Sequence, residues 1–193
     1  GSGRFVEAIR LAVSNLSGVP SVIFGLFGLT FFVTICGFGV SLLSGVLTLA
    51  VLALPIVINT TEAALNQVPQ AWREASLALG ANKQQTIFKI ILPAALPGIL
   101  TGNILALSRG AGETAAIMYT AAVFYTPKMG DSILDPVMSL PYHIYVLATS
   151  SVDVDATRPM QYGTACLLVL MVLGLNLVAL FIRQRAQRKI ARQ

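Results

Sequence analysis

Near the middle of the chain stands Glu74-Ala75-Ser76-Leu77-Ala78-Leu79-Gly80, and Ile90-Ile91-Leu92-Pro93 follows it. Apolar runs lie on both sides of this charged and structured segment, at 41–59 before it and 97–124 after it. About 20 helical residues cross the roughly 30 Å of hydrocarbon in a bilayer, and both runs approach or exceed that length. The segment 62–93 is therefore predicted to connect two membrane helices.

The composition of the whole chain agrees with a membrane protein. Of its 193 residues, 55% are hydrophobic and only 11% are charged, and the mean hydropathy is +0.77. A chain with so few charged side chains is typical of an integral membrane protein. We predict an all-α integral membrane fold, a single domain over 1–193, with four transmembrane helices at 20–37, 41–59, 97–124 and 162–182. The segment 125–161 is too polar and too rich in proline to cross, so it is expected to lie at the external surface.

Basic residues indicate the orientation of these helices. Ten of them belong to the two chain ends and to 62–93, whereas the opposite side holds only Lys128 and Arg158. By the positive-inside rule, both ends and the segment 62–93 face the cytoplasm. The same rule accounts for the net charge of +5, so no nucleic-acid partner is expected. The ten residues are Arg4, Arg10, Arg73, Lys83, Lys89, Arg183, Arg185, Arg188, Lys189 and Arg192.

Glycine positions predict two local features of the membrane helices. Gly37 and Gly39 permit a tight reversal between the first two helices. Gly98 and Gly102 form a small-xxx-small pattern, which favours close packing against another helix.

The segment 62–93 reads as two short helices joined by a turn. Pro69 suits the start of the first helix, and Gly80 suits its left-handed end. Asn82 is then the N-cap of a second helix that runs from Lys83 to Pro93. Small residues at the centre of the first helix let the groove of another protein approach closely.

This segment resembles the cytoplasmic signature of ABC-importer permeases. The signature is Glu-Ala-Ala, three residues, Gly, nine residues and Ile-x-Leu-Pro, and only Ser76 departs from it. The resemblance implies a coupling helix over 72–80 that is seated on a separate ATP-binding subunit. The coupling residues would be Trp72, Arg73, Glu74, Ala75, Ser76 and Gly80. The alternative is an ordinary cytoplasmic loop.

Three further stretches resemble the phosphate-importer permeases of the PstA family, namely 18–28, 108–115 and 135–145. The resemblance implies a type I ABC-importer permease fold in the inner membrane, with the first two of the family's six helices missing. It implies a second permease subunit, an extracytoplasmic phosphate-binding protein and membrane lipid as partners, in addition to the ATP-binding subunits. The implied substrate is inorganic phosphate.

Arg109 and Glu113 are the candidate pathway residues. They are expected near the middle of the 97–124 helix, and a spacing of four places them on one helical face. Ionised side chains at that depth are costly, so they normally face a bundle interior or an aqueous path. The guanidinium of Arg109 matches phosphate oxygens, while Glu113 can accept a hydrogen bond from a protonated phosphate. The alternative is a structural ion pair that never meets substrate.

Motifs for ATP hydrolysis and for metal binding are missing from the sequence. The chain has no Gly-x-x-x-x-Gly-Lys-Ser/Thr phosphate loop, so ATP hydrolysis is expected on a partner and this chain is not expected to be an enzyme. With His143 as the single histidine, we expect no histidine metal cluster and no cofactor. Two other functions stay open: a permease for another oxyanion such as molybdate or sulfate, and a membrane scaffold or regulatory subunit that conducts nothing.

Overall fold

The computed structural model describes residues 3–127, 130–151 and 154–190. Lys128 and Arg192, which entered the charge comparison, lie outside the described residues, as do the side chains of Arg188 and Lys189. The described part is mostly helical, as predicted. Its elements are α1 (Arg4–Ser17), α2 (Ser21–Gly28), η1 (Leu29–Ile35), α3 (Leu42–Asn66), α4 (Gln70–Ala78), α5 (Lys83–Thr86), η2 (Ile87–Ile91), α6 (Leu92–Ala111), η3 (Ile117–Tyr119), β1 (Ala122–Val123), β2 (Val137–Met138), α7 (Leu140–Thr149) and α8 (Val154–Ile190).

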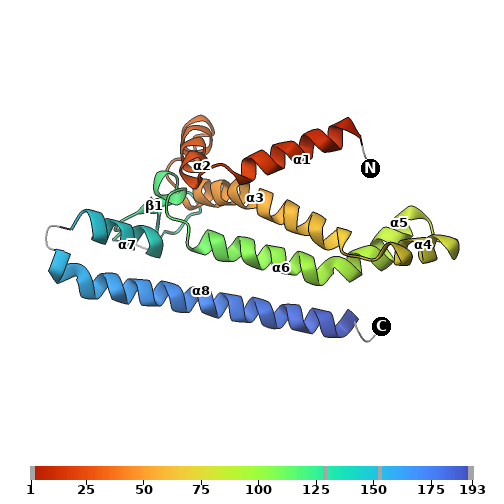
Figure 1. Ribbon diagram of the computed structural model, residues 1–193. Coiled ribbons are helices and arrows are strands. Elements are labelled where there is room, and N and C mark those ends of the chain that lie inside the picture. The colour runs from red at the N-terminus through yellow and green to blue at the C-terminus, as the bar shows by residue number, and fades with distance from the viewer. Residues whose placement is uncertain (1–2, 128–129, 152–153, 191–193) are drawn as a thin grey trace.

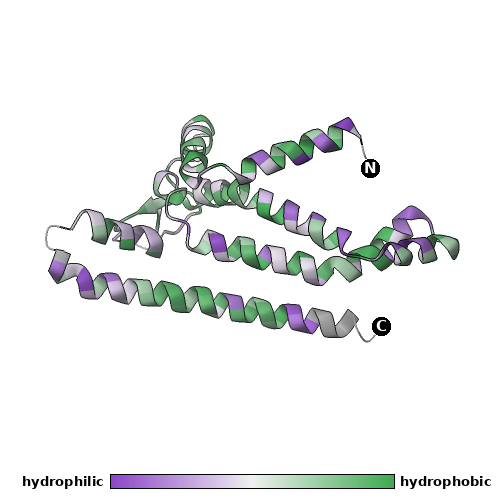
Figure 2. Ribbon diagram, viewed as in Figure 1, coloured by the Kyte–Doolittle hydropathy of each residue, from purple (hydrophilic) through white to green (hydrophobic). Residues whose placement is uncertain are grey.

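Three helices of the described chain are long and apolar enough to cross a membrane by themselves. They are α3, the continuous run Lys83–Ala111 that joins α5, η2 and α6, and Asp155–Arg185 within α8. Each contains a stretch of 18 residues that is strongly apolar, with mean hydropathies of 2.3, 1.9 and 2.8. Figure 1 shows them running lengthwise beside one another, with α4 and α5 at one end and α7 and β1 at the other. The first residues of α1 and the last of α8 lie toward the α4 end (Figure 1). Figure 2 shows apolar residues along most of α8, and no residue in the most apolar stretch of this helix is fully buried within the described chain.

The span predicted over 20–37 is different in the structure. It is the second arm of a broken helix, because α1 and the run Ser21–Ile35 meet at a bend of 102°. Pro20 stands directly before α2 and has no N–H to continue the ladder of α1. Only the two arms together are long enough for a fourth crossing. Contacts with α3 hold α1 in place, since Arg10 pairs with Glu62 and Asn59 Nδ2 donates to Ser17 Oγ at 3.2 Å.

The helix predicted over 97–124 is also corrected. It begins at Lys83 and ends at Ala111, so 112–121 is irregular apart from η3. Glycines at 110 and 112 disfavour its continuation, because glycine costs about 1 kcal/mol in a helix relative to alanine. Two other glycines make room for the irregular segment: a Cβ on Gly25 would lie 2.8 Å from the Ala115 carbonyl oxygen, and one on Gly45 would lie 2.5 Å from the Ala121 Cβ. The segment therefore lies in a slot formed by α2 and α3.

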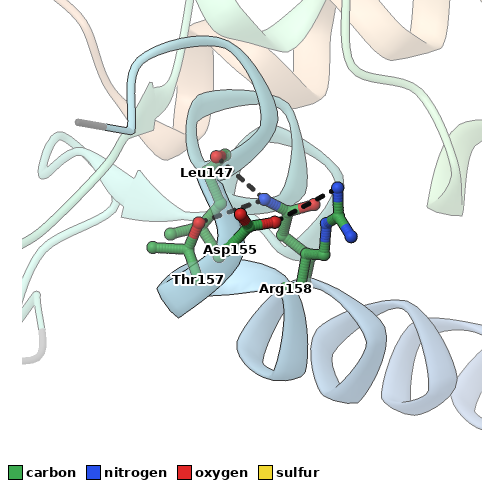
Figure 3. Close-up of polar contacts among 5 residues, drawn as sticks. Leu147, Asp155, Thr157 and Arg158 are labelled. Carbon is green, nitrogen blue, oxygen red and sulfur yellow. Dashed lines mark hydrogen bonds and ion pairs between the residues drawn. The ribbon is translucent and has the colours of Figure 1, made fainter. Parts of the chain in front are cut away.

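The other predicted boundaries shift less. The run 41–59 lies within α3, which continues to Asn66, and the run 162–182 lies within α8, which begins at Val154. The external segment 125–161 thus contains β2, α7 and the first turns of α8. Gln161 Nε2 joins these two helices by donating to the Leu147 carbonyl at 3.1 Å and to Thr157 Oγ1 at 3.3 Å (Figure 3). Arg158 pairs with Asp155 at 3.2 Å in the same cluster (Figure 3).

The α3–α6 crossing carries the core at the α4 end of the molecule. Its buried cluster consists of Ala64 and Val68 from the end of α3 and its following turn, with Ile91 and Ala95 from η2 and α6. A Cβ on Gly98 would come within 2.6 Å of the Ala64 Cβ. The small-xxx-small pattern therefore packs α6 closely against α3. A displacement of one of these helices is expected to move the other.

Candidate functional site

The segment 72–80, predicted to be a coupling helix, lies in and just after the helix α4 (Gln70–Ala78). Pro69 stands at the N-cap of α4, and Gly80 has a φ of +83°, which an alanine would adopt only at a cost. Asn82 then starts α5 with a capping box, in which its side chain accepts from the Gln85 N–H at 2.8 Å and the Gln85 side chain accepts from the Asn82 N–H at 3.0 Å. The expected second helix does not stop at Pro93, however, because it continues into α6.

The outer face of α4 is free for a partner in the described chain. Trp72 is 52% exposed and Leu79 is 90% exposed, and Glu74 and Ala75 are also exposed. The carboxylate of Glu74 accepts a hydrogen bond from Gln70 Nε2 at 3.1 Å within the same helix. A hollow of about 330 Å³ lies beside Leu79 and Gly80 and reaches Lys89 of η2. The outer face thus offers apolar side chains and a carboxylate next to a small cavity.

Arg73 and Ser76 belong to the inner face instead. Arg73 Nη2 donates to the Leu65 carbonyl of α3 at 2.8 Å. The Ser76 hydroxyl lies 3.0 Å from the Thr86 hydroxyl of α5. These two members of the predicted coupling set therefore contact the membrane helices of their own chain.

Arg109 and Glu113 do not share a helical face. Arg109 lies in the last turn of α6, exposed, and toward the end of the helix remote from α4 rather than near its middle. Glu113 follows the helix end, and its Oε1 accepts from the Ala116 N–H at 3.4 Å. No ion pair joins the two side chains, both of which lie in the described part of the chain. The i, i+4 argument is wrong because the helix ends at Ala111.

Arg109 borders a groove of about 910 Å³ between α3, α6 and α8. Most of its lining is aliphatic, with Asn103, Ser108 and Asn176 as polar exceptions. The Ser108 hydroxyl donates to Asn176 Oδ1 and links α6 to α8. Sequence reasoning missed these residues. The sequence signal that could have found them is an amide side chain inside an apolar run. An unpartnered polar group is costly there, so such a side chain is expected to bond to another helix. Glu113 does not line this groove.

Comparison with known proteins identifies the family. The model of the family described as the binding-protein-dependent transport system inner membrane component matches residues 2–192. The chain belongs to this family. Its fold is that of a type I ABC-importer permease, because 95% of the chain superposes on 76% of a chain of the MetNI methionine ABC transporter in an inward-facing conformation, with a TM-score of 0.73 at 21% identity. Family membership and the apolar helices together make it a multi-pass inner-membrane protein.

Several curated members of this permease family are similar along nearly the whole chain. A probable ABC transporter permease of Bacillus subtilis, YqgI, is 34% identical over 98% of this chain and 68% of its own length. The phosphate transport system permease protein PstA of Mycobacterium leprae is 37% identical over 98% of this chain and 61% of its own length. Its counterpart in Xylella fastidiosa is 36% identical over 91% and 58%. The chain thus spans less than two thirds of the two phosphate permeases.

Proposed function

We propose that this chain is a transmembrane permease subunit of an ATP-driven importer of inorganic phosphate. The observation that carries the proposal is the position of α4, which bears the importer signature and stands at the end of the closely packed α3–α6 pair. The phosphate permeases of two bacteria, similar along nearly the whole chain, support the substrate. ATP hydrolysis is assigned to separate subunits, since the chain has no phosphate loop.

The ATP-binding subunits would dock on the outer face of α4. The exposed indole of Trp72 and the exposed Leu79 offer apolar area, and Glu74 offers a carboxylate at the rim. Aromatic side chains commonly supply the largest share of binding energy at such contacts. A side chain of the partner would fit the hollow beside Gly80.

Arg109 would meet the anion. Its guanidinium is exposed at the border of the membrane groove, and its planar fork of donors suits two phosphate oxygens at once. The aliphatic lining around it lowers the local dielectric, which strengthens a charge-assisted hydrogen bond.

In this proposal Glu113 helps to select phosphate over other anions. Its half-buried carboxylate lies in the segment that follows α6, where it is held by the Ala116 N–H. A carboxylate accepts a hydrogen bond from a protonated phosphate and repels a fully ionised anion. Together with Arg109, it would favour phosphate over an anion that carries no proton.

Orientation and assembly follow from the same arrangement. Both chain ends and α4 would face the cytoplasm, because the basic residues gather there and α1 begins and α8 ends toward that side (Figure 1). The membrane groove is open, so a second permease subunit is needed to enclose a pathway. A phosphate-binding protein would dock at the opposite end, near α7.

Uptake by the complete complex in proteoliposomes tests the proposal. With the ATP-binding subunits, a second permease and the binding protein present, labelled phosphate should accumulate only with ATP, and excess sulfate or molybdate should not compete. Glu74→Lys should abolish accumulation. Competition by molybdate or sulfate would identify a permease for another oxyanion. Assembly and ATP binding without flux of any anion would instead identify a scaffold, a role with which the mostly aliphatic groove is compatible.

A further inference from the structure

Two polar side chains on the inner face of α4 contact two different membrane helices. Arg73 and Ser76 are three positions apart, so they project from the same side of the helix. Arg73 reaches α3, and Ser76 reaches α5, which is continuous with α6. The inner face of α4 thus joins the helix before it in the chain to the helix after it.

The bond from Arg73 closes the end of α3. Leu65 belongs to the last turn of α3, where carbonyl groups have no partner within the helix and a cation is favourable. Arg73 Nη2 donates to that carbonyl at 2.8 Å. Its Nε is buried and has no hydrogen-bond partner among the described residues. The guanidinium is therefore enclosed against α3 and is turned away from any partner on the outer face.

The bond from Ser76 is directional. Thr86 is 3% exposed, and its hydroxyl also lies 3.1 Å from the Asn82 carbonyl, which can only accept. The single proton of Thr86 is thus directed to Asn82, and Ser76 donates its own proton to Thr86 Oγ1. The importer signature has alanine at position 76, and alanine cannot make this bond.

The turn between α4 and α5 passes through a left-handed glycine. Gly80 has φ +83°, and no atom lies within 4 Å of the position of a Cβ on it. Leu79 beside it is 90% exposed. Within the turn, the Gly80 N–H donates to the Leu77 carbonyl at 3.0 Å and the Ala81 N–H donates to the Ser76 carbonyl at 3.2 Å. These bonds close the end of α4 on itself, so Arg73 and Ser76 supply the polar contacts from α4 to α3 and to α5.

We propose that Arg73 and Ser76 are positioning residues that fasten α4 to α3 and to α6 at the same time, so that one displacement of α4 moves both membrane helices together. This inference rests on the proposed function, since it assigns the path by which motion of the ATP-binding subunits enters the membrane. It separates the signature into an outer face that meets the partner and an inner face that transmits the motion.

A double-mutant cycle on Ser76 and Thr86 tests the clamp in the assembled complex. The variants are Ser76→Ala, Thr86→Val and the double variant. A fourth variant, Ser76→Thr, changes the side chain but keeps the hydroxyl. Thr101→Val is the matched control, because among the described residues its hydroxyl bonds only to the Pro97 carbonyl of its own helix. Two quantities are measured: phosphate imported per ATP hydrolysed, and hydrogen exchange of the α4 amides.

We expect each single variant to keep ATP hydrolysis, to lower phosphate per ATP by about threefold and to raise α4 exchange by a similar factor, the scale of one hydrogen bond. The double variant should be no worse than Thr86→Val, while Ser76→Thr and Thr101→Val should match the wild type. Unchanged exchange in Ser76→Ala, or additive effects in the double variant, would overturn the clamp. Unchanged phosphate per ATP with raised exchange would overturn its transmitting role. A wild-type complex that imports no phosphate would contradict the proposed function, and exchange would still decide the clamp.

Discussion

Gly98 of α6 lies directly against Ala64 of α3, with only 2.6 Å between the position of a Cβ on Gly98 and the Cβ of Ala64. One turn further along, Gly102 meets the side chain of Thr60 at still closer range. The two backbones therefore approach more closely than larger side chains would allow. This approach makes α3 and α6 one mechanical unit beneath α4.

Gly98→Ala should destabilise the protein, because the added methyl group overpacks the helix crossing. Gly174→Ala is the control, since nothing lies within 4 Å of a Cβ at that position of α8. We expect a difference of about 1–3 kcal/mol in the free energy of unfolding between the two variants. Denaturation in detergent micelles measures it. Equal stability of the two variants would contradict the packing of the crossing.

Trp72→Ala should weaken binding of the ATP-binding subunit without affecting the fold. An exposed indole at the centre of an interface is typically worth more than about 1 kcal/mol, so affinity should fall by about tenfold. Tyr125→Ala is the control, because Tyr125 is 71% exposed but lies near the opposite end of the molecule. Titration of the purified permease with the ATP-binding subunit measures both affinities. A weaker complex with the Tyr125 variant and an unchanged one with the Trp72 variant would place the interface elsewhere.

Arg109→Lys should impair phosphate uptake even though the positive charge is retained. Lysine is a point charge and cannot offer two parallel donors to phosphate, so we expect KM for phosphate to rise by about tenfold. Arg158→Lys, at the paired arginine near the start of α8, should leave KM unchanged. Initial rates of uptake over a range of phosphate concentrations give both values. An unaltered KM in Arg109→Lys would remove Arg109 from the pathway.

Gly80→Ala should destabilise the turn after α4 by about 1–2 kcal/mol, because an L-residue is strained in the left-handed region. The effect is purely one of backbone conformation, since the space around Gly80 is open. Gly163→Ala also adds a methyl group in open space, but its backbone is helical, so it should be neutral or stabilising. Hydrogen exchange of the α4 and α5 amides reports the difference. Equal exchange in the two variants would argue against a strained turn.

Cysteine labelling should reveal the orientation. In a background with Cys36→Ala and Cys166→Ala, since both native thiols are exposed, Ala81→Cys should react with an impermeant maleimide only in inverted vesicles. Ser132→Cys should react only in intact spheroplasts. The opposite pattern would reverse the assignment of both ends to the cytoplasm.

Local signals in the sequence were sufficient to predict the helix–turn–helix of α4 and α5. Pro69, Gly80 and Asn82 act through their own backbone geometry, and each takes the role that its residue type predicts. The end of α6 could not be predicted in the same way. The residues from Ala115 to Ala122 are again mostly apolar. The irregular path of 112–121 depends on room provided by Gly25 and Gly45, which are distant in the sequence.

The geometry of the candidate pathway also depends on contacts between residues that are distant in the sequence, and the sequence alone did not predict it. Arg109 stands out in an apolar run, but its distance from Glu113 depends on where the helix ends. The link between Ser108 and Asn176 joins residues 68 positions apart, and no periodicity relates them. The direction of Arg73 likewise follows from the packing of α4 on the end of α3.

The slot that receives residues 112–121 also sets an order of events during synthesis. Its walls, α2 and α3, leave the ribosome before the segment that fills it, and chains generally fold from the N-terminal side as they emerge. Both walls of the slot are thus translated before residues 112–121. An enlarged side chain at Gly25 would therefore allow insertion of the early helices and halt maturation only when the later segment arrives.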